Sequence, residues 1–214
     1  MPDKINYQKL ALEELERIHA SNKRPSLLFH VCCGPCSCYP LTFLCPHFDV
    51  TILYNNSNIY PPEEFDKRLG ELKKLIDYLK RDYGFEIKLV VPAYDNDEYN
   101  KALAPFATSP EGGERCHVCY RKRMAEAYDY AEEKGYDYFT TVMTVSRQKD
   151  SQIMNQIGEE LSKTHTRTKY FFSDFKKNNG QMIGVQIRKK YDLYNQIYCG
   201  CVYSYQEMLQ RLEH

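Results

Sequence analysis

The chain has 214 residues, which suits one compact domain, and we expect residues 1–214 to form a single unit. Lysine and arginine together number 29, as do aspartate and glutamate, so the charge balance neither indicates nor excludes nucleic acid, which would need a local basic patch. No apolar run approaches the roughly 20 residues that span a bilayer, and the polar N-terminus lacks a signal-peptide core, so we expect a cytoplasmic protein with no membrane partner.

Strands and helices are expected to alternate along the chain. Residues 7–20 carry apolar side chains at helical spacing and predict a peripheral N-terminal helix. Short apolar runs predict strands at 26–31, 49–54, 85–91 and 136–143, with a weaker one at 170–172. Helices are predicted at about 61–83, 97–106, 116–134 and 150–163, and the C-terminal third is expected to be mostly helical or irregular.

This alternation predicts an α/β fold with a mostly parallel sheet of about four to five strands, helices on both faces and a helical C-terminal part. Such sheets bind ligands beyond the carboxyl ends of their strands. Three loops should therefore meet at one edge of the sheet: Cys32–Cys36, Asn55–Asn58 and Thr144–Lys149.

Nine cysteines indicate metal ligation or redox chemistry, because a cytoplasmic chain is kept reduced and has little use for disulfides. Seven of them form three groups, Cys32-Cys33-x-x-Cys36, Cys116-x-x-Cys119 and Cys199-x-Cys201. Two C-x-x-C steps alone would suit a structural zinc ion. The surplus of thiols and the vicinal pair at the expected ligand-binding edge favour a larger 4Fe-4S cluster, which offers ligand sites at several corners.

The pair Cys199-Gly200-Cys201 is too closely spaced for an unstrained disulfide. As a dithiol it would either hold a second metal or cycle as a redox couple, and both alternatives stay open. Cys38 and Cys45 have apolar neighbours and are interpreted as core residues. His30, inside a buried strand, is interpreted as a hydrogen-bonded core histidine.

Polar residues after the second predicted strand are candidate substrate-binding groups. Asn56, Asn58 and Tyr60 could read or stack on a base. Glu64 and Arg68 lie one helical turn apart. They either contact substrate or form a buried ion pair that braces this loop.

Cationic residues near the cysteines are candidates for phosphate contacts. Arg115 and Arg123 flank the second cysteine pair, and Ser146 and Lys149 follow the fourth predicted strand, where a helix N-terminus could cradle phosphate. A further basic track, or simply a solvated surface, is formed by Lys176, Lys177, Arg188, Lys189 and Lys190.

Four ordered motifs between residues 26 and 204 resemble those of one known family. They are His30-Val31-Cys32-Cys33-Gly34-Pro35-Cys36; Asn56-x-Asn58-Ile59-x-Pro61-x-x-Glu64-Phe65-x-x-Arg68; Gly112-Gly113-x-Arg115-Cys116-x-x-Cys119-Tyr120-x-x-Arg123; and Tyr198-Cys199-Gly200-Cys201-x-Tyr203-Ser204. Together they resemble the epoxyqueuosine reductase QueH family.

The resemblance implies an adenine-nucleotide hydrolase-like (HUP) three-layer α/β fold, a 4Fe-4S cluster and no cobalamin. It implies reduction of epoxyqueuosine to queuosine at the wobble position of tRNA, the last step of queuosine biosynthesis, with electrons from a donor that the motifs do not identify. By their places in the motifs, Cys32, Cys33, Cys116 and Cys119 would ligate the cluster. Cys199 and Cys201 would be a redox-active pair or ligands of an adjacent iron. Family members can carry aspartate at the position of Cys36, which suits a ligand of that second iron.

Removing the epoxide oxygen as water takes two electrons and two protons, whereas a cluster passes electrons singly. The adjacent iron or the dithiol is therefore expected as a second redox or Lewis-acid element. Two alternative functions are a tRNA thiolase of related fold and a zinc-stabilised RNA-binding module. The thiolase would need an ATP-binding loop where Cys33-Gly34-Pro35-Cys36 stands.

Overall fold

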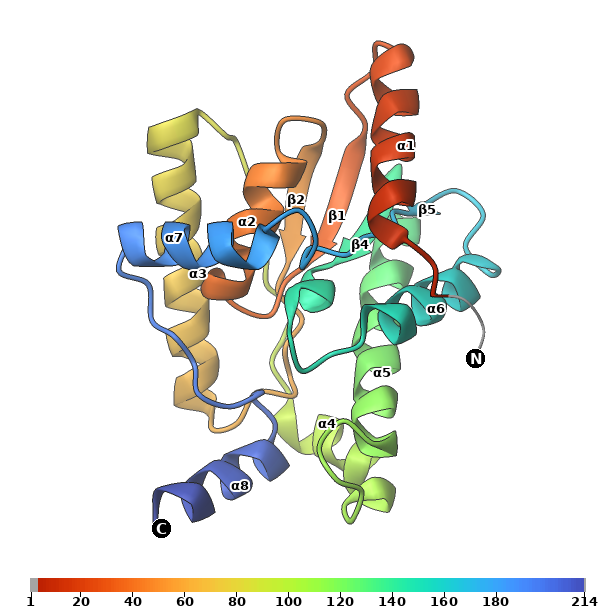
Figure 1. The fold of residues 1–214 in the computed structure, drawn as a ribbon. Coiled ribbons are helices and arrows are strands. Elements are labelled where there is room, and N and C mark those ends of the chain that lie inside the picture. The colour runs from red at the N-terminus through yellow and green to blue at the C-terminus, as the bar shows by residue number, and fades with distance from the viewer. Residues whose placement is uncertain (1–3, 214) are drawn as a thin grey trace.

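A computed structural model describes residues 4–213. One sheet of five parallel strands has the order β3-β2-β1-β4-β5 (Figure 1). The strands are β1 Ser26–His30, β2 Asp49–Leu53, β3 Lys88–Val90, β4 Tyr138–Thr141 and β5 Lys169–Tyr170. Each overlaps a segment predicted as a strand, so the α/β fold with a parallel sheet is confirmed, although most strands are shorter than expected.

The helices of the described chain are α1 Tyr7–Ala20, α2 Gly34–Leu44, α3 Pro62–Tyr83, α4 Asn96–Leu103, α5 Glu114–Lys134, α6 Ser151–Ser162, α7 Gly180–Lys190 and α8 Val202–Leu212. Short 3-10 helices follow α4 (η1, Ala104–Phe106) and β4 (η2, Val142–Val145). None of these helices combines the length and apolar character needed to cross a bilayer.

The helices cover both faces of the sheet, as the alternation of side chains along the strands requires (Figure 1). Leu27 and Phe29 of β1 belong to a core shared with α2, α3 and α7, whereas Leu28 belongs to a core shared with α5 and α6. The apolar side of α1 joins the first core, and Glu14 of α1 accepts a hydrogen bond of 2.6 Å from Tyr138 of β4. The N-terminal helix therefore packs against the β4 side of the sheet.

Helix α2 is the element that sequence patterns do not predict. Pro40 lies inside it and cannot donate a hydrogen bond to the carbonyl of Cys36, four residues earlier. Residues on several sides of the helix are buried, including Ser37, Cys38 and Leu41, so no amphipathic period marks it. Its position follows instead from packing against α3 and α7 in the first core.

The topology creates a crevice at the carboxyl end of β1. β2, which follows β1 in the chain, pairs with one side of β1, and β4 pairs with its other side. The loops that leave β1 and β4 therefore run in opposite directions from this point. The residues that follow β1 are Cys32–Cys36, and those that follow β4 form η2 and the loop to Lys149. Two of the three loops expected at this edge therefore flank the crevice directly.

Candidate metal centre

The first cysteine group lies where β1 passes into α2. The thiol sulfurs of Cys32, Cys33 and Cys36 all lie within 4.8 Å of one another, and those of Cys32 and Cys33 are 3.8 Å apart. A Cβ atom on Gly34 would lie only 2.8 Å from the carbonyl oxygen of Glu71 in α3. Glycine at this position therefore lets α2 begin against α3, and this contact fixes where the flanking cysteines sit.

The three thiols influence one another's pKa values through their hydrogen bonds. Hydrogen bonds from Cys33 and Cys36 hold the pKa of Cys32 well below its usual value, and the positive charges of Arg123 and Lys149 act in the same direction. Burial raises the pKa of Cys33 well above its usual value, and the hydrogen bond to Cys32 raises the pKa of Cys36 to about 12. The most acidic of the three thiols is therefore the one beside two cations.

The second cysteine group lies in the first two turns of α5. The backbone N–H of Gly112 donates to the Cys116 sulfur at 3.2 Å, and the Tyr99 hydroxyl donates to the Cys119 sulfur at 3.3 Å. Burial is the main cause that raises the pKa of Cys119 to about 11, and the thiols of Cys199 and Cys201 act in the same direction. The second and third cysteine groups are therefore close enough to interact electrostatically.

Arg68 holds the third cysteine group in place. Its guanidinium, on a side chain that is 1% exposed, donates to the carbonyls of Cys199 at 3.0 Å and Tyr198 at 3.2 Å. Its Nε atom pairs with Glu64 at 2.7 Å. Of the two expectations for Glu64 and Arg68, the structure shows the buried ion pair, and the loop that it braces carries Cys199.

Tyr60 joins the second and fourth motifs through its backbone. Its N–H donates to the Gly200 carbonyl at 2.7 Å, and its carbonyl accepts from the Tyr198 hydroxyl at 2.6 Å. Gly200 has a φ of +130°, a conformation that residues with a side chain rarely adopt. Cys201 then caps α8, since its sulfur accepts from the Ser204 N–H at 3.5 Å. The ring of Tyr60 is half-buried, so a stacking role for it stays a prediction.

Arg123 lies in a buried hydrogen-bond network beneath the first cysteine group. Its Nη2 atom donates to the Asn56 side chain at 2.6 Å and lies 3.2 Å from His30 Nε2. Asn56 in turn donates to the Val31 carbonyl at 2.8 Å. Burial and the Arg123 charge hold the pKa of His30 well below its usual value, so the ring is neutral. The core interpretation of His30 is confirmed.

The expected phosphate contact of Arg123 does not fit this position, because the side chain is 2% exposed and faces other protein groups. Asn56 and Asn58, at 1% and 2% exposed, are likewise enclosed. Arg115 is also buried: it donates to the carbonyls of Ala107 at 2.8 Å and Ser109, and its guanidinium lies 4.3 Å from the ring centre of Tyr203. In this structure these side chains hold loops together, and any contact with substrate stays a prediction.

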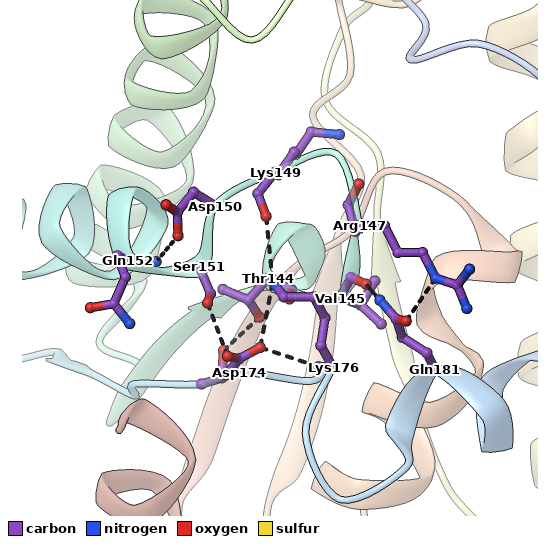
Figure 2. Close-up of polar contacts among 12 residues, drawn as sticks. Thr144, Val145, Arg147, Lys149, Asp150, Ser151, Gln152, Asp174, Lys176 and Gln181 are labelled. Carbon is purple, nitrogen blue, oxygen red and sulfur yellow. Dashed lines mark hydrogen bonds and ion pairs between the residues drawn. The ribbon is translucent and has the colours of Figure 1, made fainter. Parts of the chain in front are cut away.

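A cavity of about 140 Å³ opens at the carboxyl ends of β1 and β4. Cys32, Cys36 and Cys199 line it, and so do Ser146 and Lys149. Figure 2 shows the Lys149 side chain leaving its loop on the side away from Lys176. Burial would lower the pKa of Lys149, but the neighbouring Cys199, Tyr120 and Cys32 outweigh it and raise that pKa, so the ammonium stays charged. The cavity therefore combines sulfur ligands with the Lys149 ammonium, and Arg68, Arg211 and Glu111 also line it.

The helix N-terminus next to this loop is already occupied. The carboxylate of Asp150 accepts from the Gln152 N–H at 2.8 Å and caps α6, and Ser151 donates to Asp174 at 2.9 Å (Figure 2). A phosphate would have to displace the Asp150 carboxylate from the helix end. The phosphate cradle expected there stays a prediction, and Ser146 and Lys149 line the cavity.

Lys176 braces the loop that carries Lys149. Its ammonium donates to the carbonyls of Thr144 at 2.8 Å and Lys149 at 3.4 Å and lies 3.4 Å from Asp174 (Figure 2). Its predicted place in a basic surface track is therefore wrong. The ammonium of Lys190 also has a protein partner, since it forms an ion pair of 2.7 Å with Asp82.

Two residues that touch the cysteines carry no signal in the sequence. Gln196 donates to the sulfurs of Cys33 at 3.1 Å and Cys36 at 3.4 Å, and Tyr99 reaches Cys119 from α4. Neither lies within a cysteine motif, and glutamine and tyrosine are common at surfaces and in cores. Only their positions relative to the thiols identify them.

Thiolates are soft ligands that select zinc, copper(I) or iron–sulfur clusters. Within residues 4–213, Cys32, Cys33 and Cys36 form the group whose ligand atoms are close enough to share one metal ion. No cysteine of the described chain is in a disulfide, so all three groups offer free thiols. The donor set therefore fits a sulfur-ligated metal centre, with Cys116, Cys119, Cys199 and Cys201 as neighbouring donors.

Comparison with known proteins gives a consistent result. The family model described as "Epoxyqueuosine reductase QueH" matches residues 27–207. The chain is 38% identical to a protein of that name from Streptococcus pyogenes serotype M1, over 94% of this chain and 78% of the other. It is 34% identical to one from Staphylococcus aureus strain Mu50, over 94% and 84%, and 28% identical to one from Thermotoga maritima, over 88% and 93%.

Proposed function

This chain belongs to the epoxyqueuosine reductase QueH family, and we propose that it reduces epoxyqueuosine to queuosine in tRNA at the cysteine-lined cavity. One observation carries the proposal: the four motifs that mark the family contact one another around a single site. The contacts are Asn56 to the Val31 carbonyl, Arg123 to Asn56, Arg68 to the Cys199 carbonyl and Arg115 to the Tyr203 ring. In three of these pairs the residues are 67 to 131 positions apart in the chain, so the fold brings separate motifs together at this site.

We propose that Cys32, Cys33, Cys116 and Cys119 hold a 4Fe-4S cluster, and that Cys36, Cys199 and Cys201 hold a second iron or act as a redox pair. Because Cys36 lies within 4.8 Å of Cys32 and Cys33, a metal bound by Cys36 would adjoin the cluster. When bound, such a centre supplies electrons. The surrounding cations, Arg123 and Lys149, offset the negative charge of the thiolates.

The residues of the chain supply binding and orientation. The reaction adds two electrons and two protons to the epoxide and releases its oxygen as water, leaving a carbon–carbon double bond. We assign to Lys149 the binding of that oxygen, because Lys149 lines the same cavity as Cys32 and Cys199. Lys176 keeps the Lys149 loop in place from behind. The small cavity also limits how much water reaches the site.

The reductase activity is tested on tRNA. In a host that makes queuosine and has no second enzyme for this step, deletion of the gene should leave epoxyqueuosine at the wobble position, and the intact gene should restore queuosine. Mass spectrometry of digested tRNA separates the two nucleosides, which differ by one oxygen. Unchanged queuosine in the deletion strain would overturn the proposed function.

A substitution in the third cysteine group should lower turnover without removing the cluster. Cys199→Ser is expected to lower turnover by at least about a hundredfold while most of the cluster absorbance remains, because Cys199 is assigned to the second centre. Loss of the cluster in this variant would show that Cys199 is a cluster ligand. Iron counted before and after the substitution distinguishes a second iron, whose loss removes about one ion per chain, from a dithiol, whose loss removes none.

A further inference from the structure

A groove of about 310 Å³ opens beside the cavity and shares its wall. Cys36, Val145 and Gln196 line both hollows, so the groove leads directly to the cysteine site. Its remaining walls come from the loop after η2 and from α7. The groove is therefore continuous with the place where the substrate nucleoside is proposed to react.

The groove is positively charged. Arg147 and Arg188 line it, and no acidic residue does. Neither arginine has a carboxylate of residues 4–213 within 4.0 Å, whereas most exposed cations of the chain, such as Lys80 and Lys101, are paired. Two unpaired guanidinium groups in one groove favour an anionic ligand.

Arg147 is held in position for such a ligand. Its Nε atom donates to the side-chain amide oxygen of Gln181 at 2.8 Å. The amide nitrogen of Gln181 in turn donates to the Val145 carbonyl at 3.2 Å (Figure 2). This contact uses one of the five N–H groups of the guanidinium and leaves its terminal nitrogens available. A guanidinium fixed in this way loses less conformational entropy when it binds.

One short loop thus carries two cations to two adjoining hollows. Lys149 lines the cavity and Arg147 lines the groove, and Figure 2 shows their side chains leaving the loop in different directions. A ligand that satisfies both has a reactive part in the cavity and an anionic part in the groove. A nucleotide within a strand has this form, because its base is flanked by phosphates on both sides.

We propose that this groove binds the phosphates of the anticodon strand next to the modified nucleoside, through Arg147 and Arg188. The inference rests on the proposed function, which places that nucleoside in the adjoining cavity.

The test measures binding of tRNA that carries epoxyqueuosine, isolated from cells lacking the reductase, to the metal-loaded protein over a range of salt concentrations. The double variant Arg147→Ala/Arg188→Ala is expected to bind about tenfold more weakly near physiological salt. Its log–log salt slope should be less steep by about 1.4, at roughly 0.7 for each lost contact with a single strand. Arg147→Lys/Arg188→Lys should keep most of the slope, since the charges remain.

The matched control is Lys23→Ala/Lys73→Ala, which removes two exposed cations outside the groove. A slope change equal to that of the control would overturn the groove assignment, because it would reflect net charge alone. The two proposals fail separately. If the wild-type protein does not reduce the tRNA but the groove variant still flattens the slope, the function is wrong and the groove stands; if reduction occurs and the slope is unchanged, the groove is wrong.

Discussion

Replacing Cys33 with alanine is expected to abolish metal binding and, with it, reduction of the tRNA. Cys33 is completely buried, and its sulfur lies within 4.8 Å of those of Cys32 and Cys36, so its removal takes away one of the three clustered sulfur ligands. Metal that binds only the folded chain stabilises it by about 3 kcal/mol at a concentration a hundredfold above Kd. For a domain of this size, that loss corresponds to a Tm lower by roughly 6–12 °C.

The measurement compares anaerobically prepared wild-type and Cys33→Ala proteins by iron, zinc and sulfide content and by Tm with and without metal. Iron with acid-labile sulfide in the wild type is expected, and its loss together with the metal-dependent part of Tm is expected in the variant. Cys45→Ala is the matched control, since Cys45 is equally buried but lies in the first core. Stoichiometric zinc without sulfide would contradict the cluster and favour the zinc-stabilised module.

Replacing Arg68 with alanine is expected to destabilise the fold by about 3–5 kcal/mol and to abolish turnover. The substitution leaves Glu64 buried without its cation, which is the most costly way to break a buried ion pair. It also frees the carbonyls of Tyr198 and Cys199, so the third cysteine group loses its support. Urea unfolding gives the stability change, and conversion of epoxyqueuosine in tRNA gives the activity.

A second variant separates the two effects of Arg68. Arg68→Ala/Glu64→Gln removes the uncompensated buried charge and should regain about half of the lost stability, while activity stays low because the carbonyl of Cys199 still lacks its donor. If activity returns with stability, Arg68 matters only for folding, and its assignment to the position of Cys199 is wrong.

The charged residues of the motifs show a limit of reading function from sequence. Arg115 and Arg123 lie close to cysteines in the sequence, and this position predicts that they contact phosphates of the substrate. In the structure both are nearly fully buried and hydrogen-bonded to protein groups. Side chains that follow one another along a helix point in different directions around its axis. Packing against the rest of the protein decides which of them face inward. Arg147 and Arg211, both outside every motif, are exposed cations beside the site.

By itself the sequence determined the parallel α/β fold, the edge of the sheet where ligands bind and the three cysteine groups. These features depend on local patterns: buried strands are runs of apolar residues, amphipathic helices repeat every 3.6 residues, and ligands to one metal recur at short spacing. The family assignment rests on the same motifs and agrees with the match over residues 27–207.

Only the tertiary structure decided which side chains face the cavity. Helix α2 has no period to reveal it, because it is buried on several sides and contains Pro40. Lys176, Gln196 and Gln181 contact residues 27 to 163 positions away in the chain, and these contacts exist only once the sheet has formed. Such contacts leave no trace in local spacing, because they depend on how separate elements pack and not on the residues beside them.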